Sequence, residues 1–134
     1  MRQLINSTGY SADDKIIAVS SYDFDLSVYD IFGILSAGGT LILIKDSNSR
    51  DAEVWLDIAE RHSVTLVEFC SDFIEYAVNR SGRKGKEIPS LRLAMLSGDW
   101  IGMDIPERLN HVAKKFSSFI YGWSHGSFNL VQFF

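Results

Sequence analysis

Hydrophobic residues in this chain fall into two alternating kinds of run, and the alternation predicts the fold class. Short apolar runs rich in β-branched residues are typical of strands that are buried on both faces. Between them, apolar residues recur every three or four positions, which is the spacing of an amphipathic helix. Strands are expected at 15–21, 40–44, 64–69, 91–96 and 117–121, and helices are expected to begin at Ser27, Asp51, Ser71 and Asp104. The pattern favours an α/β fold: a parallel sheet with helices on both faces.

The first predicted helix and the glycines after it are the most informative local segment. Ser27 followed by Asp30 has capping-box spacing, which marks a helix start. The helical period places four apolar residues on one stripe, expected to be buried: Val28, Ile31, Phe32 and Leu35. The pair Gly38–Gly39 is expected to supply the left-handed stop before the next strand.

Composition narrows the range of functions. The chain has 134 residues, of which 46% are apolar and 22% charged, so we expect residues 1–134 to form a single α/β unit with its own core. A net charge of −4 argues against nucleic-acid binding. The single cysteine, Cys70, excludes an internal disulfide and fits a reducing compartment. No apolar run is long enough to cross a bilayer, so a cytoplasmic protein without membrane contact is expected.

The expected sheet also predicts where a ligand binds. In open parallel sheets, ligands bind beyond the carboxyl ends of the strands. Those ends fall at 23–25, 68–71, 97–99 and from Gly122 onward, where most of the chemically distinctive residues lie. Asp25 and Tyr29 fall outside the apolar stripe of their helix, so Asp25 serves either as a helix cap or as a ligand-binding group.

Several stretches resemble the adenylation (AMP-binding) domains of nonribosomal peptide synthetases. Residues 24–33, with Gly38–Gly39 after them, resemble the family's fourth core motif, and Ile120-Tyr121-Gly122 resembles the start of its fifth. The stretch 91–101 is similar to the strand and turn before that fifth motif. The resemblance covers roughly residues 14–122. It therefore identifies the chain as the central fragment of such a domain.

The resemblance implies an activity. These domains make an aminoacyl adenylate from an amino acid and ATP with magnesium, then pass the acyl group to a carrier-protein thiol. Asp25 matches the aspartate that binds the substrate ammonium, a charge-assisted interaction. The other implied substrate-pocket positions are Leu26, Tyr29, Glu68, Met95, Ser97, Ile120 and Phe128, with Asn129 beside them. The implied nucleotide-binding positions are Gly98, Asp99, Tyr121, Gly122 and Ser124. Asp25, Leu26, Tyr29 and Ser97 are similar to the pattern of cysteine-activating members, but Glu68, Met95 and Asn129 depart from it. The amino acid is therefore left open.

Other features depart from the family. His125 stands where the family has a glutamate that binds magnesium, and magnesium prefers oxygen ligands. The family's phosphate loop and its lysine-bearing C-terminal subdomain are not found in residues 1–134. We therefore expect no catalytic residue in this chain and no turnover by it alone. The rest of an adenylation domain and a carrier protein are its expected partners.

Two alternatives to an enzyme fragment remain at this stage. The chain is also compatible with a non-catalytic remnant or binding module, which His125 and the missing phosphate loop favour over a working enzyme. The run Gly122-Trp123-Ser124-His125-Gly126 also fits the G-x-S-x-G nucleophile elbow of α/β-hydrolases, and it follows a predicted strand as that fold requires. The chain order of that fold is serine, then acid, then histidine, and none of the nine residues after His125 is acidic or a histidine, which disfavours this alternative.

Overall fold

A computed structural model of the protein describes residues 9–18, 29–45, 47, 51–70, 76, 79, 87–97, 104–113, 118–124 and 127–133. Its strands are β1 (Lys15–Ala18), β2 (Thr40–Leu43), β3 (Leu66–Cys70), β4 (Leu93–Ser97), β5 (Ser118–Ser124) and β6 (Ser127–Phe133). Its helices are the π-helix η1 (Tyr29–Gly33), α2 (Ile34–Ser36), α3 (Ala52–Arg61) and α5 (Ile105–Val112).

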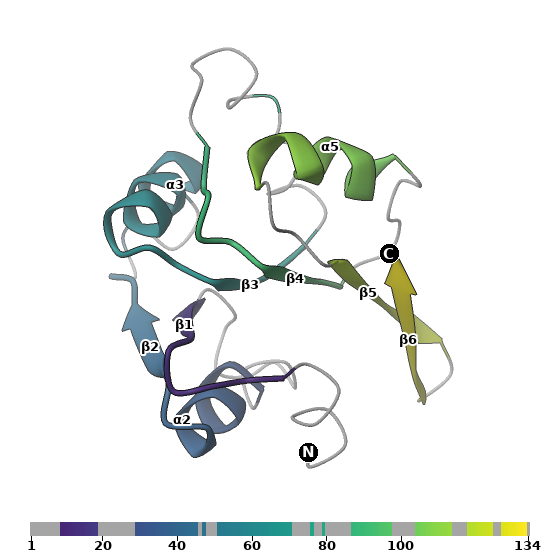
Figure 1. Ribbon diagram of the computed structural model, residues 1–134, viewed down its shortest axis with the longest axis horizontal. Helices are drawn as coiled ribbons and strands as arrows, with labels where there is room; N and C mark the ends of the chain where they lie inside the picture. Colours follow the sequence, from purple (N-terminus) through teal and green to yellow (C-terminus); the bar gives the residue numbers. More distant parts are fainter. Residues whose placement is uncertain are drawn as a thin grey trace.

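The strands form one six-stranded sheet in the order β2-β1-β3-β4-β5-β6. The first five strands in this order are parallel, and β6 runs antiparallel to β5. Helices α3 and α5 lie on one face of the sheet and α2 lies on the other (Figure 1). The predicted α/β fold with helices on both faces is confirmed, whereas the antiparallel strand β6 was not predicted from the sequence.

Neighbouring residues of the central strands point into two separate cores. Ile17 of β1 and Val67 of β3 belong to the core beneath α3 and α5, together with Leu56 and Ala59. The core on the α2 face contains Tyr10, Ile16, Ile34, Leu66 and Leu93. Because successive strand residues face opposite sides, a strand covered on both sides must be apolar at nearly every position. This explains the uninterrupted apolar runs in the sequence.

The start of α3 also follows the sequence. The carboxylate oxygen Oδ1 of Asp51 accepts hydrogen bonds from the backbone nitrogens of Glu53 at 3.0 Å and Val54 at 3.5 Å, which confirms Asp51 as the N-cap. Helix α5 begins directly after Asp104, also as predicted. In the helix expected from Ser71, only residues 76 and 79 lie within the described part of the chain.

The predicted buried stripe of the first helix is wrong at Phe32 and Leu35. Phe32 is 60% exposed and Leu35 is 51% exposed, whereas Ile34, which the stripe omitted, is fully buried. The reason is that residues 29–33 wind as a π-helix, whose i→i+5 hydrogen bonds make a wider turn than an α-helix. An α-helical period therefore assigns the wrong residues to the core. Of the other two residues of the stripe, Ile31 is half-buried and Val28 lies outside the described residues.

The two glycines after α2 have different roles. Gly38 has a φ of +81°, so it supplies the left-handed stop as predicted. Gly39 has no positive φ. A Cβ atom on Gly39 would lie 2.8 Å from the carbonyl oxygen of Asp14 and 2.6 Å from Cδ1 of Ile34, so only glycine fits this close approach. The prediction of a left-handed stop was therefore right for Gly38. At Gly39, glycine is required because close packing leaves no room for a side chain.

Candidate functional site

The order of the strands points to one place on the sheet for a ligand. From β1 the chain passes to β2 on one side and then returns to β3 on the other, giving the order 2-1-3-4-5 of flavodoxin-like sheets. In such sheets the crevice between the diverging connections, beyond the carboxyl ends of β1 and β3, is the usual ligand site. Here those strands end at Ala18 and Cys70. The candidate site therefore lies at the carboxyl ends of the central strands, where the sequence placed it.

The strand register brings three of the predicted pocket positions together at this site. Glu68 pairs with Met95 across β3 and β4, and Cys70 pairs with Ser97 one step closer to the strand ends. Glu68, Met95 and Ser97 are thus neighbours in the carboxyl half of two adjacent strands, although 29 positions of sequence numbering separate Glu68 from Ser97.

Glu68 is a buried carboxylate at this position. Its side chain is 3% exposed. Leu66 and Val67, whose side chains are the other described ones of β3, are also buried, but they are apolar. Alternation along the strand puts Glu68 on the same face as Leu66, which is the face that α2 covers through Ile34. Tyr29 begins η1, which leads directly into α2 and contacts β1. Tyr29 therefore begins the helical segment that packs on the same face of the sheet to which Glu68 belongs.

The predicted nucleotide positions follow along β5. Leu96 pairs with Ile120, and β4 ends at Ser97, so the backbone of 122–124 continues beyond the end of β4. The chain then returns as β6, which pairs Gly122 with Asn129. Tyr121, Gly122, Ser124 and Phe128 all lie in this β5–β6 hairpin. The β5–β6 hairpin is therefore one edge of the sheet, and its strand β5 lies next to β4, which carries Met95 and Ser97.

Among the candidate site positions, five lie outside the described residues: Asp25, Leu26, Gly98, Asp99 and His125. Their roles stay predictions. No three histidine, cysteine, aspartate or glutamate side chains gather as a metal site within the described ranges. A histidine at position 125 is a poor match for magnesium, so no chemical step is assigned to that ion here.

The nucleophile-elbow interpretation is wrong. That motif needs a sharp turn from a strand into a helix, with the serine at the turn. Ser124 is instead the last residue of β5, and the chain re-enters the sheet as β6 three residues later. In the hairpin, Ser124 pairs with Ser127 across the two strands. The structure therefore lacks the local geometry that would activate this serine.

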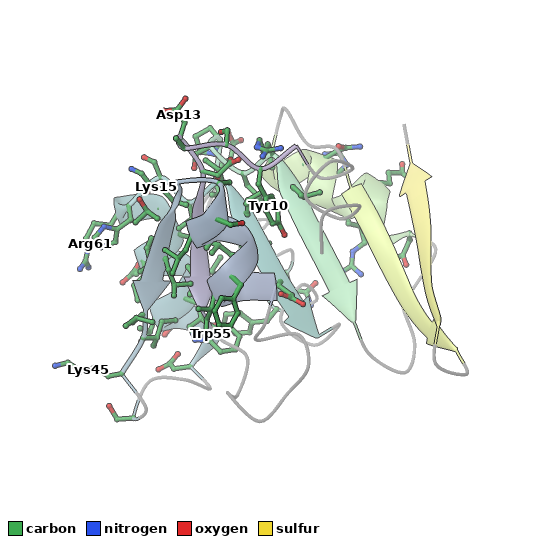
Figure 2. The ribbon with its side chains drawn as sticks, turned by 90° about the horizontal axis from the view of Figure 1, so that it is seen from below. Tyr10, Asp13, Lys15, Lys45, Trp55 and Arg61 are labelled. Atoms are coloured by element: carbon green, nitrogen blue, oxygen red, sulfur yellow. The ribbon has the colours of Figure 1, made fainter. Side chains whose placement is uncertain are left out.

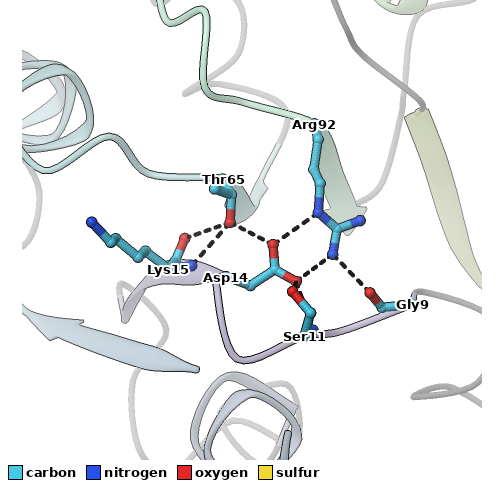
Figure 3. A network of polar contacts seen from close by, with 6 residues as sticks. All are labelled: Gly9, Ser11, Asp14, Lys15, Thr65 and Arg92. Carbon is cyan, nitrogen blue, oxygen red and sulfur yellow. Dashed lines mark hydrogen bonds and ion pairs between the residues drawn. The ribbon is translucent and has the colours of Figure 1, made fainter. Parts of the chain in front are cut away.

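A polar cluster at the opposite, amino ends of the strands was missed by the sequence analysis (Figure 3). Asp14, 2% exposed, precedes β1 and forms an ion pair with Arg92, which precedes β4. Nε of Arg92 donates to Oδ1 of Asp14 at 2.8 Å, and the Thr65 hydroxyl donates to the same oxygen at 2.8 Å. Ser11 donates to Oδ2 from its backbone nitrogen at 2.8 Å. The cluster ties β1, β3 and β4 together at the end remote from the candidate site.

The protonation of Asp14 reflects these contacts. Burial alone raises the pKa of Asp14, but the hydrogen bonds from Arg92, Thr65 and Ser11, together with the charge of Arg92, bring it below its ordinary value. The hydrogen bond to Asp14 raises the pKa of Arg92. Asp14 is therefore a charged, structural residue at neutral pH. Nothing in the sequence around it signals burial, because its partners lie up to 78 positions away.

The described residues also line a groove that lies away from the candidate site. This groove of about 440 Å³ runs between the edge strand β2 and helix α3, with Ile42, Ile44 and Ile58 among its lining residues. Lys45 and Arg61 also line it, and Figure 2 shows both side chains pointing outward on this side of the molecule. None of the predicted site residues lines the groove, so it is distinct from the candidate site. Within the described residues no helix combines the length and apolar character needed to cross a membrane.

Comparison with known proteins shows the family of this chain. The family model described as "AMP-binding enzyme" matches residues 1–128. The Anguibactin system regulator of Vibrio anguillarum is 44% identical over 97 residues, which cover 72% of this chain and 9% of that protein. Pyochelin synthetase PchE of Pseudomonas aeruginosa is 40% identical over 106 residues, covering 79% of this chain and 7% of that protein. The chain thus spans less than a tenth of the length of these curated relatives.

A solved structure shares the fold. The nonribosomal peptide synthetase FmoA3 in its AMPPNP-bound form superimposes with a TM-score of 0.85 at 28% identity, covering 92% of this chain and 13% of that one. FmoA3 has also been solved with alpha-methyl-L-serine-AMP bound. The sheet and helices described above are therefore those of the N-terminal subdomain of an adenylation domain.

Proposed function

Because this chain belongs to the AMP-binding enzyme family and corresponds to part of a nonribosomal peptide synthetase adenylation domain, we propose that it carries an amino-acid-binding site. In this proposal, the chain provides the substrate pocket and part of the adenine site of an enzyme that forms an aminoacyl adenylate. The observation that carries the proposal is the gathering of Glu68, Met95 and Ser97 at the carboxyl ends of β3 and β4, beside the switch between β1 and β3.

The reaction joins an amino acid to AMP. A carboxylate oxygen of the amino acid attacks the α-phosphorus of ATP, a new oxygen–phosphorus bond forms, and pyrophosphate leaves with the electrons of the bond that breaks. The nucleotide-bound form of FmoA3 supports ATP as the co-substrate. In the proposed site, Asp25 binds the substrate ammonium, and Tyr121, Gly122 and Ser124 contribute to the nucleotide side.

Catalysis by this chain alone is not part of the proposal. In-line attack at phosphorus depends on positioning and on neutralising the charge that develops, and we assign that work to parts of the domain other than residues 1–134. Transfer of the acyl group to a carrier-protein thiol, and a cytoplasmic location, also stay predictions. A test for amino-acid-dependent exchange between ATP and pyrophosphate separates an active enzyme from a binding module. Exchange with any amino acid would show that the chain is catalytically sufficient.

The proposal predicts that the chain binds an amino acid through Asp25. A panel of amino acids at millimolar concentration is expected to contain at least one that raises the melting temperature of the protein. Asp25→Ala is expected to abolish that increase, because losing one partner of a buried ion pair costs about 3–5 kcal/mol, or more than a hundredfold in affinity. Differential scanning fluorimetry measures the shift, and titration calorimetry measures the affinity.

Asp13→Ala is the matched control, because Asp13 is an exposed aspartate close in sequence to Asp25. This control is expected to keep the ligand-dependent shift. Stabilisation that survives in Asp25→Ala would mean that Asp25 does not hold the ammonium. A complete lack of stabilisation by the panel would contradict the proposed binding function itself.

A further inference from the structure

Strand β2 forms an open edge of the sheet within the described part of the chain. It pairs with β1 on one side, and no described strand lies beyond it on the other. The backbone nitrogen of Thr40 donates to the carbonyl oxygen of Asp14, next to β1, at 2.8 Å. Because successive residues of a strand turn their backbone groups to opposite edges, those of Leu41 and Leu43 point away from β1. These two residues therefore present N–H and C=O groups to which a further strand can bond.

The groove between β2 and α3 lies along this open edge and has an apolar lining. Ile42 and Ile44 line it from the side of β2, and Ile58 lines it from α3. All three are only partly buried, and they pack on the core beneath α3. Leu43, which also lines the groove, is 65% exposed. At about 440 Å³ the groove has the size of a ligand pocket, so side chains that enter it would remove apolar surface from water.

A basic residue lies at each end of the groove. Nζ of Lys15, which pairs with Thr40, donates to the carbonyl oxygen of His62 at 3.2 Å, so the end of α3 lies near the amino end of β2. Arg61, the last residue of α3, is therefore at this end, and Lys45, which follows β2, is at the other. Figure 2 shows both side chains pointing outward.

The charge of the groove differs from that of the whole chain. Lys45 and Arg61 line it together with one acidic residue, Asp57, so two positive charges face one negative charge. The chain as a whole has a net charge of −4. A strand rises about 3.3 Å per residue, so residues 40–45 cover roughly 17 Å. A carboxylate at each end of an extended segment of this length would reach the two basic residues and form charge-assisted hydrogen bonds.

We propose that this edge is a docking surface for an extended segment of another protein, which adds to β2 as a further strand. The segment has an acidic residue at each end and apolar residues at alternate positions between them, because alternate side chains of a strand face the same side. Backbone bonds to Leu41 and Leu43 give affinity, while the groove and its two basic residues give specificity. None of the proposed substrate or nucleotide positions lines the groove, so docking is independent of the proposed function.

The probe is a fluorescein-labelled peptide of sequence Glu-Val-Thr-Val-Thr-Val-Glu, whose pattern is the same in either direction along β2. Fluorescence anisotropy measures its binding to the 134-residue chain. The control peptide carries lysine in place of both glutamates and is otherwise identical. The glutamate peptide is expected to bind about tenfold or more tightly than the lysine peptide, because two charge-assisted contacts become repulsive ones. This preference is expected to become smaller as salt is added, since the basic residues are exposed.

Variants of the protein test the backbone bonds and the charges separately. Leu43→Pro removes an N–H that points away from β1, and proline is tolerated at such positions of an edge strand. It is expected to weaken binding of the glutamate peptide about tenfold or more, whereas Leu43→Ala keeps the N–H and is expected to weaken it about threefold or less. The double variant Lys45→Glu with Arg61→Glu is expected to reverse the preference, so that the lysine peptide binds more tightly. Arg108→Glu, on α5, is the matched control and is expected to keep the preference of wild type.

Circular dichroism checks that each variant is folded, and the charge-reversed variant provides the test if Leu43→Pro does not fold. Absence of binding, or equal binding of the two peptides, would overturn the inference. Binding that Leu43→Pro leaves unchanged would show that the peptide does not pair with β2 and would overturn it as well. Sedimentation of the chain alone as a dimer that Leu43→Pro dissociates would show that a second copy occupies this edge, in place of an acidic segment of another protein.

Discussion

Replacing Arg92 with leucine is expected to lower the free energy of unfolding at pH 7 by about 3 kcal/mol, the low end of the cost of breaking a buried ion pair. Asp14 would keep its charge at 2% exposure while losing the cation that compensates it. The low end applies because the Arg92 side chain is itself 34% exposed. Arg92→Leu also removes the hydrogen bond from Arg92 to the carbonyl oxygen of Gly9 at 3.0 Å. Urea denaturation followed by circular dichroism measures the change.

The loss is expected to depend on pH in a definite direction. The pKa of Asp14 is lowered in the folded protein, so its contribution to stability is present above its unfolded pKa of about 4 and disappears as the pH falls through the lower folded value. The stability gap between wild type and Arg92→Leu should therefore be constant near neutral pH. It should become smaller as the pH falls below about 4, because Asp14 is then protonated first in the unfolded chain and, at lower pH, in the folded protein as well.

Arg108→Leu is the matched control for this pair. Nη1 of Arg108 on α5 lies 3.4 Å from Oδ2 of Asp104, the residue before this helix, and the two side chains are 26% and 62% exposed. Such surface pairs contribute roughly 0–1 kcal/mol. A gap for Arg92→Leu that stays constant from pH 7 to pH 3 would show that its cost does not come from the charge of Asp14. A loss no larger than that of Arg108→Leu would show that the pair does not hold the strands together.

Ile34→Ala is expected to destabilise the protein by about 2–5 kcal/mol, because truncating a fully buried isoleucine leaves a cavity. Ile34 is the residue through which α2 packs on Tyr10, Ile16, Leu66 and Leu93. Leu35→Ala, the neighbouring substitution, is expected to cost less than about 1 kcal/mol because Leu35 is 51% exposed. Thermal or chemical denaturation of the two variants gives the comparison directly.

The comparison tests the π-helix as well as the packing. An α-helical stripe through Val28, Ile31, Phe32 and Leu35 predicts the reverse order, with Leu35→Ala the more costly change. A larger loss for Leu35→Ala would therefore show that residues 29–33 wind as an ordinary α-helix. Equal losses would show that neither residue is central to the packing of this segment.

The sequence predicted those features that depend on neighbouring residues. The apolar runs placed β1 to β5 within a few residues, because a strand covered on both faces must be apolar throughout. Asp51 marked the start of α3 since a cap acts on backbone groups only two or three positions ahead. The alternation of strands and helices predicted that the carboxyl ends of the strands lie together at one edge of the sheet. Glu68 and Ser97 fell at these ends, and the strand register makes them near neighbours.

Other features were decided by tertiary structure. The order of the strands, and with it the switch between β1 and β3, depends on which strands pair across long stretches of chain. The pairing of Asp14 with Arg92 joins residues 78 positions apart, and the burial of Glu68 at 3% exposure is not signalled by the residues around it in the sequence. The π-turn at 29–33 reassigns the core from Leu35 to Ile34, and β6 forms where β5 offers a free edge. Local residue preferences thus determined most of the elements of this protein. The strand order and the buried ion pair of Asp14 with Arg92 were set by contacts between distant residues, which form only when the whole sheet assembles.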